Sequence, residues 1–296
     1  MNNGPVKLSG PVFRPPWSSN TLSQIYERLN GLGAIGEIWD TAVSPSAEAT
    51  YASGEKTDFS EYLKENGLPV PPLVKLLSAG KPLSVQVHPD SRAAAIHGGE
   101  SKVELWYVLH AEEGSFIYYG AREGVTYDEL RDAIYNKCVT KLLNVITVKA
   151  GDVVVIPPGM IHSLGGGITV LEVQDAVGTT YRLQDISSDR ETHPVQALDS
   201  IRFYSQCELS KLTHSEVEKA NGLPGKVIAD MKGFAVCLCQ DERVAIPDGG
   251  VYMLCISGEG VCRQLSFTKG DSLYFASSDE LKLSCGSKVI LVKGRK

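Results

Sequence analysis

Two stretches of the chain combine residue types and spacings that suit a divalent metal ion. Residues 83–90 read Leu-Ser-Val-Gln-Val-His-Pro-Asp, and a glutamate follows sixteen positions after the histidine. Residues 151–162 read Gly-Asp-Val-Val-Val-Ile-Pro-Pro-Gly-Met-Ile-His. Two imidazoles, a carboxylate and an amide oxygen suit a borderline cation such as Zn²⁺, whose sites often keep one position open for water or substrate. The residues therefore predict one metal site made of Gln86, His88, Glu104 and His162.

Strands are the elements that must position these side chains. Ser84, Gln86 and His88 alternate along one segment, so they would project to the same face of a strand. Residues 102–109, which include the glutamate, are rich in β-branched and aromatic side chains and predict a second strand. A lone histidine on a strand is more often an ordinary polar residue than a ligand. Here, however, residues 151–162 combine a strand, a turn and a ligand in one piece.

The spacing Gly-x5-Pro-x-Gly-x2-His in residues 151–162 is similar to the second metal motif of the cupin barrels. The chain departs from the first cupin motif, which normally has His-x-His and a glutamate a few residues later. Its own order is Gln-x-His-Pro, Lys-x-Glu, Pro-x-Gly-x2-His, Glu-x-Gln and Thr-Tyr-Arg. In this order the chain resembles the type I mannose-6-phosphate isomerases. The matching segments are residues 36–39, 82–90, 101–109, 151–167, 171–174 and 180–185.

The resemblance implies a zinc enzyme of the cupin superfamily. It implies that Gln86, His88, Glu104 and His162 bind one zinc ion per chain, and that Ser84 contacts the phosphate of the substrate. The implied reaction is the interconversion of mannose 6-phosphate and fructose 6-phosphate.

An aldose-ketose isomerisation moves a proton between C1 and C2 through an enediol, whose developing oxyanion needs positive charge beside it. Lys102 lies two positions from Glu104 and is predicted either to carry the proton or to bind substrate oxygens. Glu172 stands in an apolar strand, where a carboxylate must be ion-paired or functional. Glu172 and Asp185 are alternative proton carriers. Arg182 is predicted to bind the phosphate or stabilise the enediolate, unless it forms a structural ion pair with Asp185 or Glu172.

Composition excludes several classes of protein. The chain of 296 residues has a net charge of −6 and no lysine- or arginine-rich run, which argues against a nucleic-acid surface. No run of eighteen apolar residues predicts a membrane span, and the first residues lack the apolar core of a signal peptide. The seven cysteines are odd in number and include no Cys-x2-Cys pair. We therefore expect reduced core cysteines and a cytoplasmic protein. We also expect a monomer or a homodimer.

Two units are predicted. Residues 1–195 comprise an N-terminal segment and a metal-binding jelly-roll barrel, and residues 196–296 form a second, degenerate cupin-like β unit. Helices are predicted at residues 22–29 and 59–65, and within insertions at 90–100 and 126–137. The second unit repeats the Gly-Asp pair at residues 270–271 but has no histidine to match His162, and its one histidine is His214. We expect a mainly β fold whose second barrel is metal-free and structural, with a regulatory ligand pocket as the alternative.

Three other functions share parts of this pattern. A non-catalytic sugar-binding cupin would keep the barrel but would not need Lys102, Glu172 and Arg182 around the metal. A cupin-type glucose-6-phosphate isomerase would use the same enediol chemistry on a different sugar. An oxygenase would use iron, also held by histidine and carboxylate ligands. The isomerase acting on mannose 6-phosphate is favoured over these alternatives.

Overall fold

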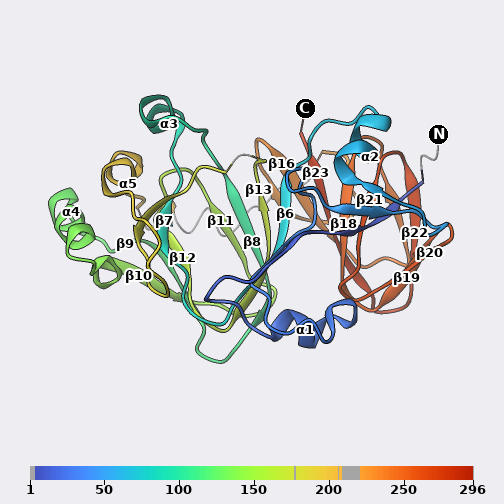
Figure 1. Cartoon of the computed structure of the whole chain (residues 1–296), viewed down its shortest axis with the longest axis horizontal. Helices are drawn as coiled ribbons and strands as arrows, with labels where there is room; N and C mark the ends of the chain where they lie inside the picture. Colours follow the sequence, from blue (N-terminus) through green and yellow to red (C-terminus); the bar gives the residue numbers. More distant parts are fainter. Residues whose placement is uncertain (1–3, 177, 206, 209–220, 296) are drawn as a thin grey trace.

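Four sheets pair into two barrels along the long axis of the molecule (Figure 1). The computed structural model describes residues 4–176, 178–205, 207–208 and 221–295. One sheet of the first barrel has the order β10 (Leu143–Thr147), β9 (Phe116–Ala121), β12 (His162–Leu164), β7 (Val85–Val87) and β14 (Tyr181–Gln184). The other has the order β11 (Val153–Ile156), β8 (Glu104–Ala111), β13 (Ile168–Gln174), β6 (Leu73–Ala79), β3 (Glu37–Trp39) and β2 (Val12–Phe13).

The second barrel contains the C-terminal strands together with three short strands from the start of the chain. Its larger sheet has the order β15 (Lys226–Asp230), β16 (Phe234–Cys239), β23 (Lys288–Gly294), β18 (Val251–Ser257), β21 (Ser272–Phe275), β1 (Val6–Ser9), β4 (Glu48–Thr50) and β5 (Lys56–Asp58). Its smaller sheet has the order β17 (Arg243–Ile246), β22 (Asp279–Leu283), β19 (Glu259–Cys262) and β20 (Leu265–Thr268). Residues far apart in the sequence therefore share one sheet.

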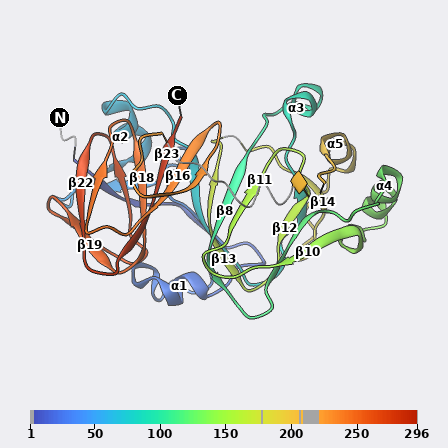
Figure 2. The same cartoon turned by 180° about the vertical axis from the view of Figure 1, so that it is seen from behind.

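Helices lie at the ends and edges of the barrels. Those whose bounds fall within the described residues are α1 (Thr21–Ile25), the 3-10 helix η1 (Glu27–Leu29), α2 (Phe59–Glu65), α3 (Ser91–His97), α4 (Tyr127–Tyr135), the 3-10 helix η2 (Val139–Leu142) and α5 (Pro194–Ser200). Seen from behind, α3, α4 and α5 gather at the far end of the first barrel (Figure 2). None of the helices in the described part of the chain has the length and apolar character needed to cross a bilayer.

Local sequence signals explain where the helices begin. Asp90 accepts a hydrogen bond from the backbone of Ala93 at the start of α3, and Thr126 and Glu129 form a capping box at the start of α4. The predicted helix at 59–65 and the helical insertions are confirmed. The helix predicted at 22–29 is instead interrupted at Tyr26, whose backbone is extended and whose ring is buried in the core.

The core has separate parts inside and between the barrels. One cluster fills the second barrel and includes Cys237, Cys239, Cys255 and Cys262, which form no disulfide. Burial raises the pKa of each of these thiols, to between about 11 and about 12, so they are small apolar core residues as predicted.

Another cluster joins the facing sheets of the two barrels and includes Leu76, Leu171, Leu254 and Ile290. The mainly β cupin fold is confirmed. The division at residues 195 and 196 stays a prediction, and His214 lies outside the described residues.

Candidate metal centre and active site

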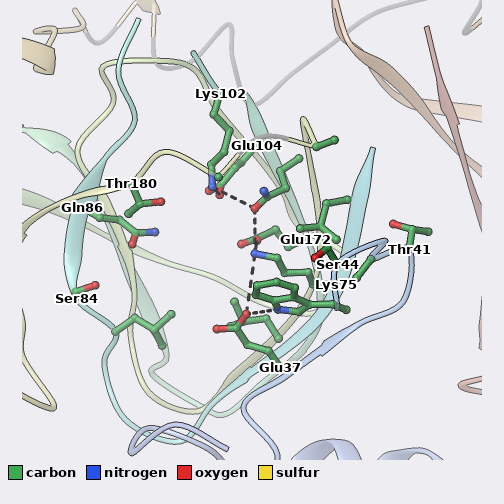
Figure 3. A pocket seen from close by; sticks show the side chains of 18 of the residues that line it. Glu37, Thr41, Ser44, Lys75, Ser84, Gln86, Lys102, Glu104, Glu172 and Thr180 are labelled. Atoms are coloured by element: carbon green, nitrogen blue, oxygen red, sulfur yellow. Dashed lines mark hydrogen bonds and ion pairs between the residues drawn. The ribbon is translucent and has the colours of Figure 1, made fainter. Parts of the chain in front are cut away.

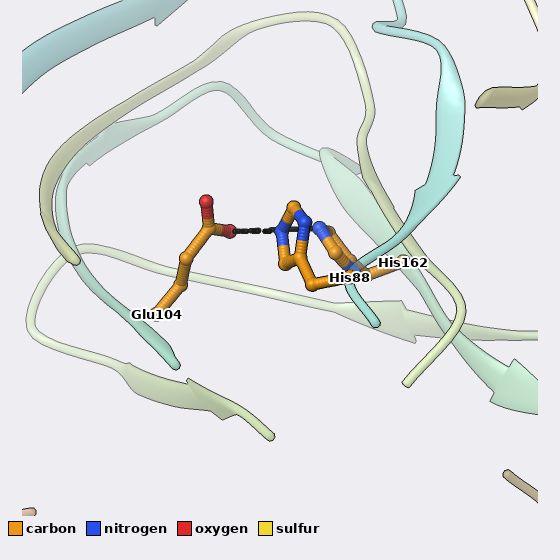
Figure 4. A group of neighbouring side chains, drawn as sticks. All are labelled: His88, Glu104 and His162. Carbon is orange, nitrogen blue, oxygen red and sulfur yellow. Dashed lines mark ion pairs between the residues drawn. The ribbon is translucent and has the colours of Figure 1, made fainter. Parts of the chain in front are cut away.

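Three predicted ligands meet at the centre of the first barrel (Figure 4). His88 follows β7, Glu104 begins β8 and His162 begins β12. One candidate ligand atom from each side chain lies within 4.8 Å of the others, and all three residues are buried. The fourth predicted ligand, Gln86, lies beside His162, because the strands β12 and β7 pair at these two residues. The structure thus places all four predicted metal ligands together.

The hydrogen bond made by one nitrogen of each imidazole ring determines which nitrogen is available to a metal. His88 Nδ1 lies 3.0 Å from the carbonyl oxygen of Thr179, and His162 Nδ1 lies 2.9 Å from that of Met160. A carbonyl oxygen only accepts hydrogen bonds, so both Nδ1 atoms carry the proton and donate it. In the neutral form of each ring, Nε2 then presents a lone pair toward Glu104. Hydrogen bonds of this kind orient metal-binding histidines in many proteins.

The carboxylate of Glu104 divides its two oxygens between the imidazoles and a lysine. Oε2 lies 3.1 Å from His88 Nε2 and 3.5 Å from His162 Nε2, whereas Oε1 lies 2.5 Å from Lys102 Nζ. Burial alone would raise the pKa of Glu104, but Lys102 and His88 hold that pKa well below its ordinary value. Glu104 is therefore an anion placed beside the two imidazoles.

The buried donor atoms fit a metal ion. Within the described ranges, His88 Nε2 and Glu104 Oε2 are buried and have no hydrogen-bond partner. Buried polar atoms without partners are costly, and a cation bound between them removes that cost. Gln86 places its side-chain amide 3.1 Å from His162 Nε2, and half a turn of the amide exchanges its nitrogen for its oxygen. This donor set is the one expected for zinc.

The metal-free protein is expected to lose stability as the pH falls from about 6.5 to about 4. Burial lowers the pKa of His88 from 6.5 to about 4, although Glu104 opposes the shift. Within this window the unfolded chain protonates His88 and the folded chain does not, so the free energy of unfolding rises with pH. The shift corresponds to about 3 kcal/mol. Urea unfolding at both ends of the window measures it.

The His88→Gln variant provides the control for this pH dependence, because glutamine does not titrate. Its metal-free form should show a clearly smaller change in the free energy of unfolding over the same window. An equal change in both proteins would contradict the assignment to His88.

A cavity of about 490 Å³ opens beside the metal ligands (Figure 3). Its lining includes two of the predicted ligands, Gln86 and Glu104, and four of the side chains predicted to bind or convert the substrate: Ser84, Lys102, Glu172 and Arg182. Asp185, the alternative proton carrier, does not line it. The four predicted catalytic and substrate-binding residues are therefore brought into one cavity.

Lys102 and Glu172 are both held by partners in the cavity wall. Lys102 donates to Gln174 Oε1 at 3.1 Å in addition to its contact with Glu104. One oxygen of Glu172 lies 2.9 Å from Lys75 Nζ, and the other accepts a hydrogen bond of 3.0 Å from Trp106 Nε1. Of the two alternatives for Glu172, the ion pair is observed. It leaves a proton-accepting role open, since an ion-paired carboxylate still has basic lone pairs.

Arg182 does not form the structural ion pair considered as its alternative role. Asp185 binds Arg190 instead, with contacts of 2.9 and 3.2 Å, and Glu172 binds Lys75. In the part of the chain that the structure describes, no carboxylate lies within 4 Å of the guanidinium, and its buried Nε has no partner. Burial and the neighbouring Arg190 lower the pKa of Arg182. This cation is available to an anion in the cavity.

Two basic residues of the cavity were missed by the sequence reasoning. Lys75 lies in the middle of β6, where its charge among apolar neighbours was the available signal, and it stacks over the ring of Trp39 at 4.9 Å. Arg190 had no such signal, because it lies in an irregular segment. It lines the cavity only because the folded chain brings that segment there. Its guanidinium is held by Asp185. Hydrogen bonds from Arg190 and Ser188 outweigh burial and lower the pKa of Asp185 to about 2.

No protein-family model matches the chain. The chain is 34% identical over 214 residues to mannose-6-phosphate isomerase of Streptococcus mutans, a match that covers 66% of this chain and 67% of that protein. It is 32% identical over 274 residues to a probable mannose-6-phosphate isomerase of Bacillus subtilis, covering 84% of this chain and 85% of that protein. The chain belongs to the mannose-6-phosphate isomerase family. The expected resemblance is confirmed.

A solved structure shows the same fold over nearly the whole length. It is a zinc-bound mannose 6-phosphate isomerase with a TM-score of 0.79 and 17% sequence identity. The match covers 99% of this chain and 100% of that chain. The family fold therefore includes both barrels.

Proposed function

We propose that the protein is a zinc-dependent isomerase that interconverts mannose 6-phosphate and fructose 6-phosphate. The observation that carries this proposal is the buried His88–Glu104–His162 group, whose Glu104 lines a cavity that Lys102 and Arg182 also line. Its membership of the mannose-6-phosphate isomerase family and the zinc bound by the matching solved structure support it.

The charge of the cavity suits an anionic sugar phosphate. Among the lining residues that the structure describes, the basic side chains of Lys75, Lys102, Arg182 and Arg190 outnumber the carboxylates of Glu37, Glu104 and Glu172. A divalent ion adds further positive charge. The net charge of the whole chain is −6, so this gathering of basic side chains is a local feature of the cavity. A phosphate dianion is thus attracted to this cavity rather than to the surface at large.

Each polar side chain has a proposed role. Bound to Gln86, His88, Glu104 and His162, one zinc ion per chain would act as a Lewis acid beside the oxyanion that develops on the substrate. Ser84 and Arg182 bind the substrate's phosphate or its reacting oxygens, because both present donors to the cavity. Lys102 donates to substrate oxygens close to the metal. Glu172, the carboxylate held by Lys75 and Trp106, accepts or returns the proton moved between C1 and C2.

A substrate panel tests the proposal. Mannose 6-phosphate should be converted to fructose 6-phosphate. Its kcat/KM should be at least about a hundredfold higher than that of mannose, because mannose has no phosphate for the basic side chains to bind. Glucose 6-phosphate should be a poor substrate. Turnover of glucose 6-phosphate alone would replace the proposal by the related isomerase, and binding without any turnover would replace it by a sugar-binding cupin.

Location and assembly are also proposals. We propose a cytoplasmic protein, because its buried cysteines form no disulfides. The protein is proposed to be a monomer or a homodimer that binds a small sugar phosphate and neither nucleic acid nor membranes. The second barrel is proposed to bind no metal.

A further inference from the structure

A buried carboxylate outside the cavity joins the two barrels. Asp40 follows β3 and is fully buried. Its Oδ2 accepts a hydrogen bond of 2.8 Å from the hydroxyl of Tyr252 and another from the hydroxyl of Ser272. Arg28 Nη2 lies 3.6 Å from the same oxygen. A buried charge is tolerated only with such partners, so this oxygen is tightly held.

The partners of Asp40 belong to the second barrel. Tyr252 lies on β18 and Ser272 on β21, which are neighbouring strands of the larger sheet. Their hydroxyl oxygens are 3.1 Å apart. Arg28 is tied to the same barrel, because its Nε donates to the carbonyl oxygen of Gly270. Asp40 is therefore bonded into the second barrel, although its own chain segment continues a strand of the first.

The two residues that flank Asp40 face the active-site cavity. Trp39 and Thr41 both line it. Trp39 Nε1 donates to Glu37 Oε2 at 2.6 Å, and its ring lies beneath Lys75. Thr41 accepts a hydrogen bond of 2.7 Å from the backbone of Val74, the residue before Lys75. A shift of Asp40 would move this wall of the cavity.

We propose that Asp40 is a positioning residue through which the second barrel holds Trp39 against Lys75, and thereby holds Lys75 against Glu172. The second barrel then contributes to the geometry of the active site without touching the substrate. This inference rests on the isomerase activity proposed above. A displacement of about an ångström in a supporting residue is enough to lower a rate substantially.

Removing the two hydroxyls that bind Asp40 tests the inference. The Tyr252→Phe/Ser272→Ala variant should lose about tenfold in kcat for mannose 6-phosphate, while KM and the zinc content per chain stay within twofold of the unchanged protein. Tyr274→Phe is the matched control. Tyr274 is buried, pairs in register with Tyr252 and does not bond Asp40, so its loss should leave kcat unchanged.

A second pair of variants separates positioning from general destabilisation. Asp40→Asn keeps an oxygen that accepts from both hydroxyls and should retain most of the activity, whereas Asp40→Leu keeps none and should lose it. In a double-mutant cycle, Trp39→Phe and Tyr252→Phe should be non-additive in kcat, because both act on the same wall.

The outcomes are distinct. If the unchanged protein converts mannose 6-phosphate but the hydroxyl variants keep their kcat, or if the cycle is additive, the positioning role is wrong. A kcat loss in Tyr274→Phe equal to that of the double variant would also overturn it. If the unchanged protein shows no turnover at all, the proposed function fails before this inference is reached.

Discussion

Replacing His162 by alanine is expected to remove zinc binding and isomerase activity together. His162 supplies one of the nitrogen donors of the buried group and contacts Glu104 and Gln86 on either side. The substitution leaves three of the four predicted ligands and a buried cavity where the imidazole ring was. We expect the zinc content to fall at least about tenfold and kcat to fall by about a thousandfold or more, since ligands of a catalytic metal act as a unit.

The control for this variant is His110→Ala. His110 lies on the same strand as Glu104 but outside the metal group, so zinc content and kcat should be unchanged. Metal analysis of the purified proteins and the assay with mannose 6-phosphate measure both quantities. Full activity in His162→Ala, or zinc retained at one ion per chain, would contradict the proposed centre.

Replacing Arg182 by alanine is expected to lower kcat/KM by about a hundredfold to a thousandfold. The guanidinium faces the cavity, and no carboxylate within the described residues neutralises it. Removing one preorganised donor to a developing oxyanion costs about this much in known enzymes. Arg182→Lys keeps the charge but loses the paired donors, so it should recover only part of the loss. Zinc content should not change in either variant.

Arg131→Ala provides the comparison for a surface arginine. Arg131 lies on α4, is paired with Asp128 and Asp132, and does not line the cavity. Its loss should leave kcat/KM within twofold of the unchanged protein. If Arg182→Ala behaved in the same way, Arg182 would have no role in catalysis or phosphate binding.

The candidate metal ligands could be recognised in the sequence because their signals are local. Gln86 in β7, His88 directly after that strand and the turn before His162 fix direction and spacing within a few residues. Lys102 and Glu104 are close in sequence and stay close in space. Local signals cannot show that the three segments come together in space. That expectation came from the family resemblance.

The environment of the catalytic side chains depends on pairings that one sequence does not reveal. Lys75 meets Glu172 because β6 and β13 pair at this register, and the sequence alone contains no signal for that pairing. The strands β1, β4 and β5 are only three or four residues long, yet they join the larger sheet of the second barrel. Strands this short are too weak as local patterns to predict their partners. The attachment of Asp40 was hidden for the same reason.

Reversible loss of activity on metal removal is the most direct test of the proposed function. Purified protein is assayed for the conversion of mannose 6-phosphate to fructose 6-phosphate before chelation, after chelation and after the return of one equivalent of zinc. Turnover that disappears on chelation and returns with zinc is the expected result. Turnover that survives with no metal bound, or its absence when zinc is bound at one ion per chain, would contradict a zinc-dependent mannose-6-phosphate isomerase.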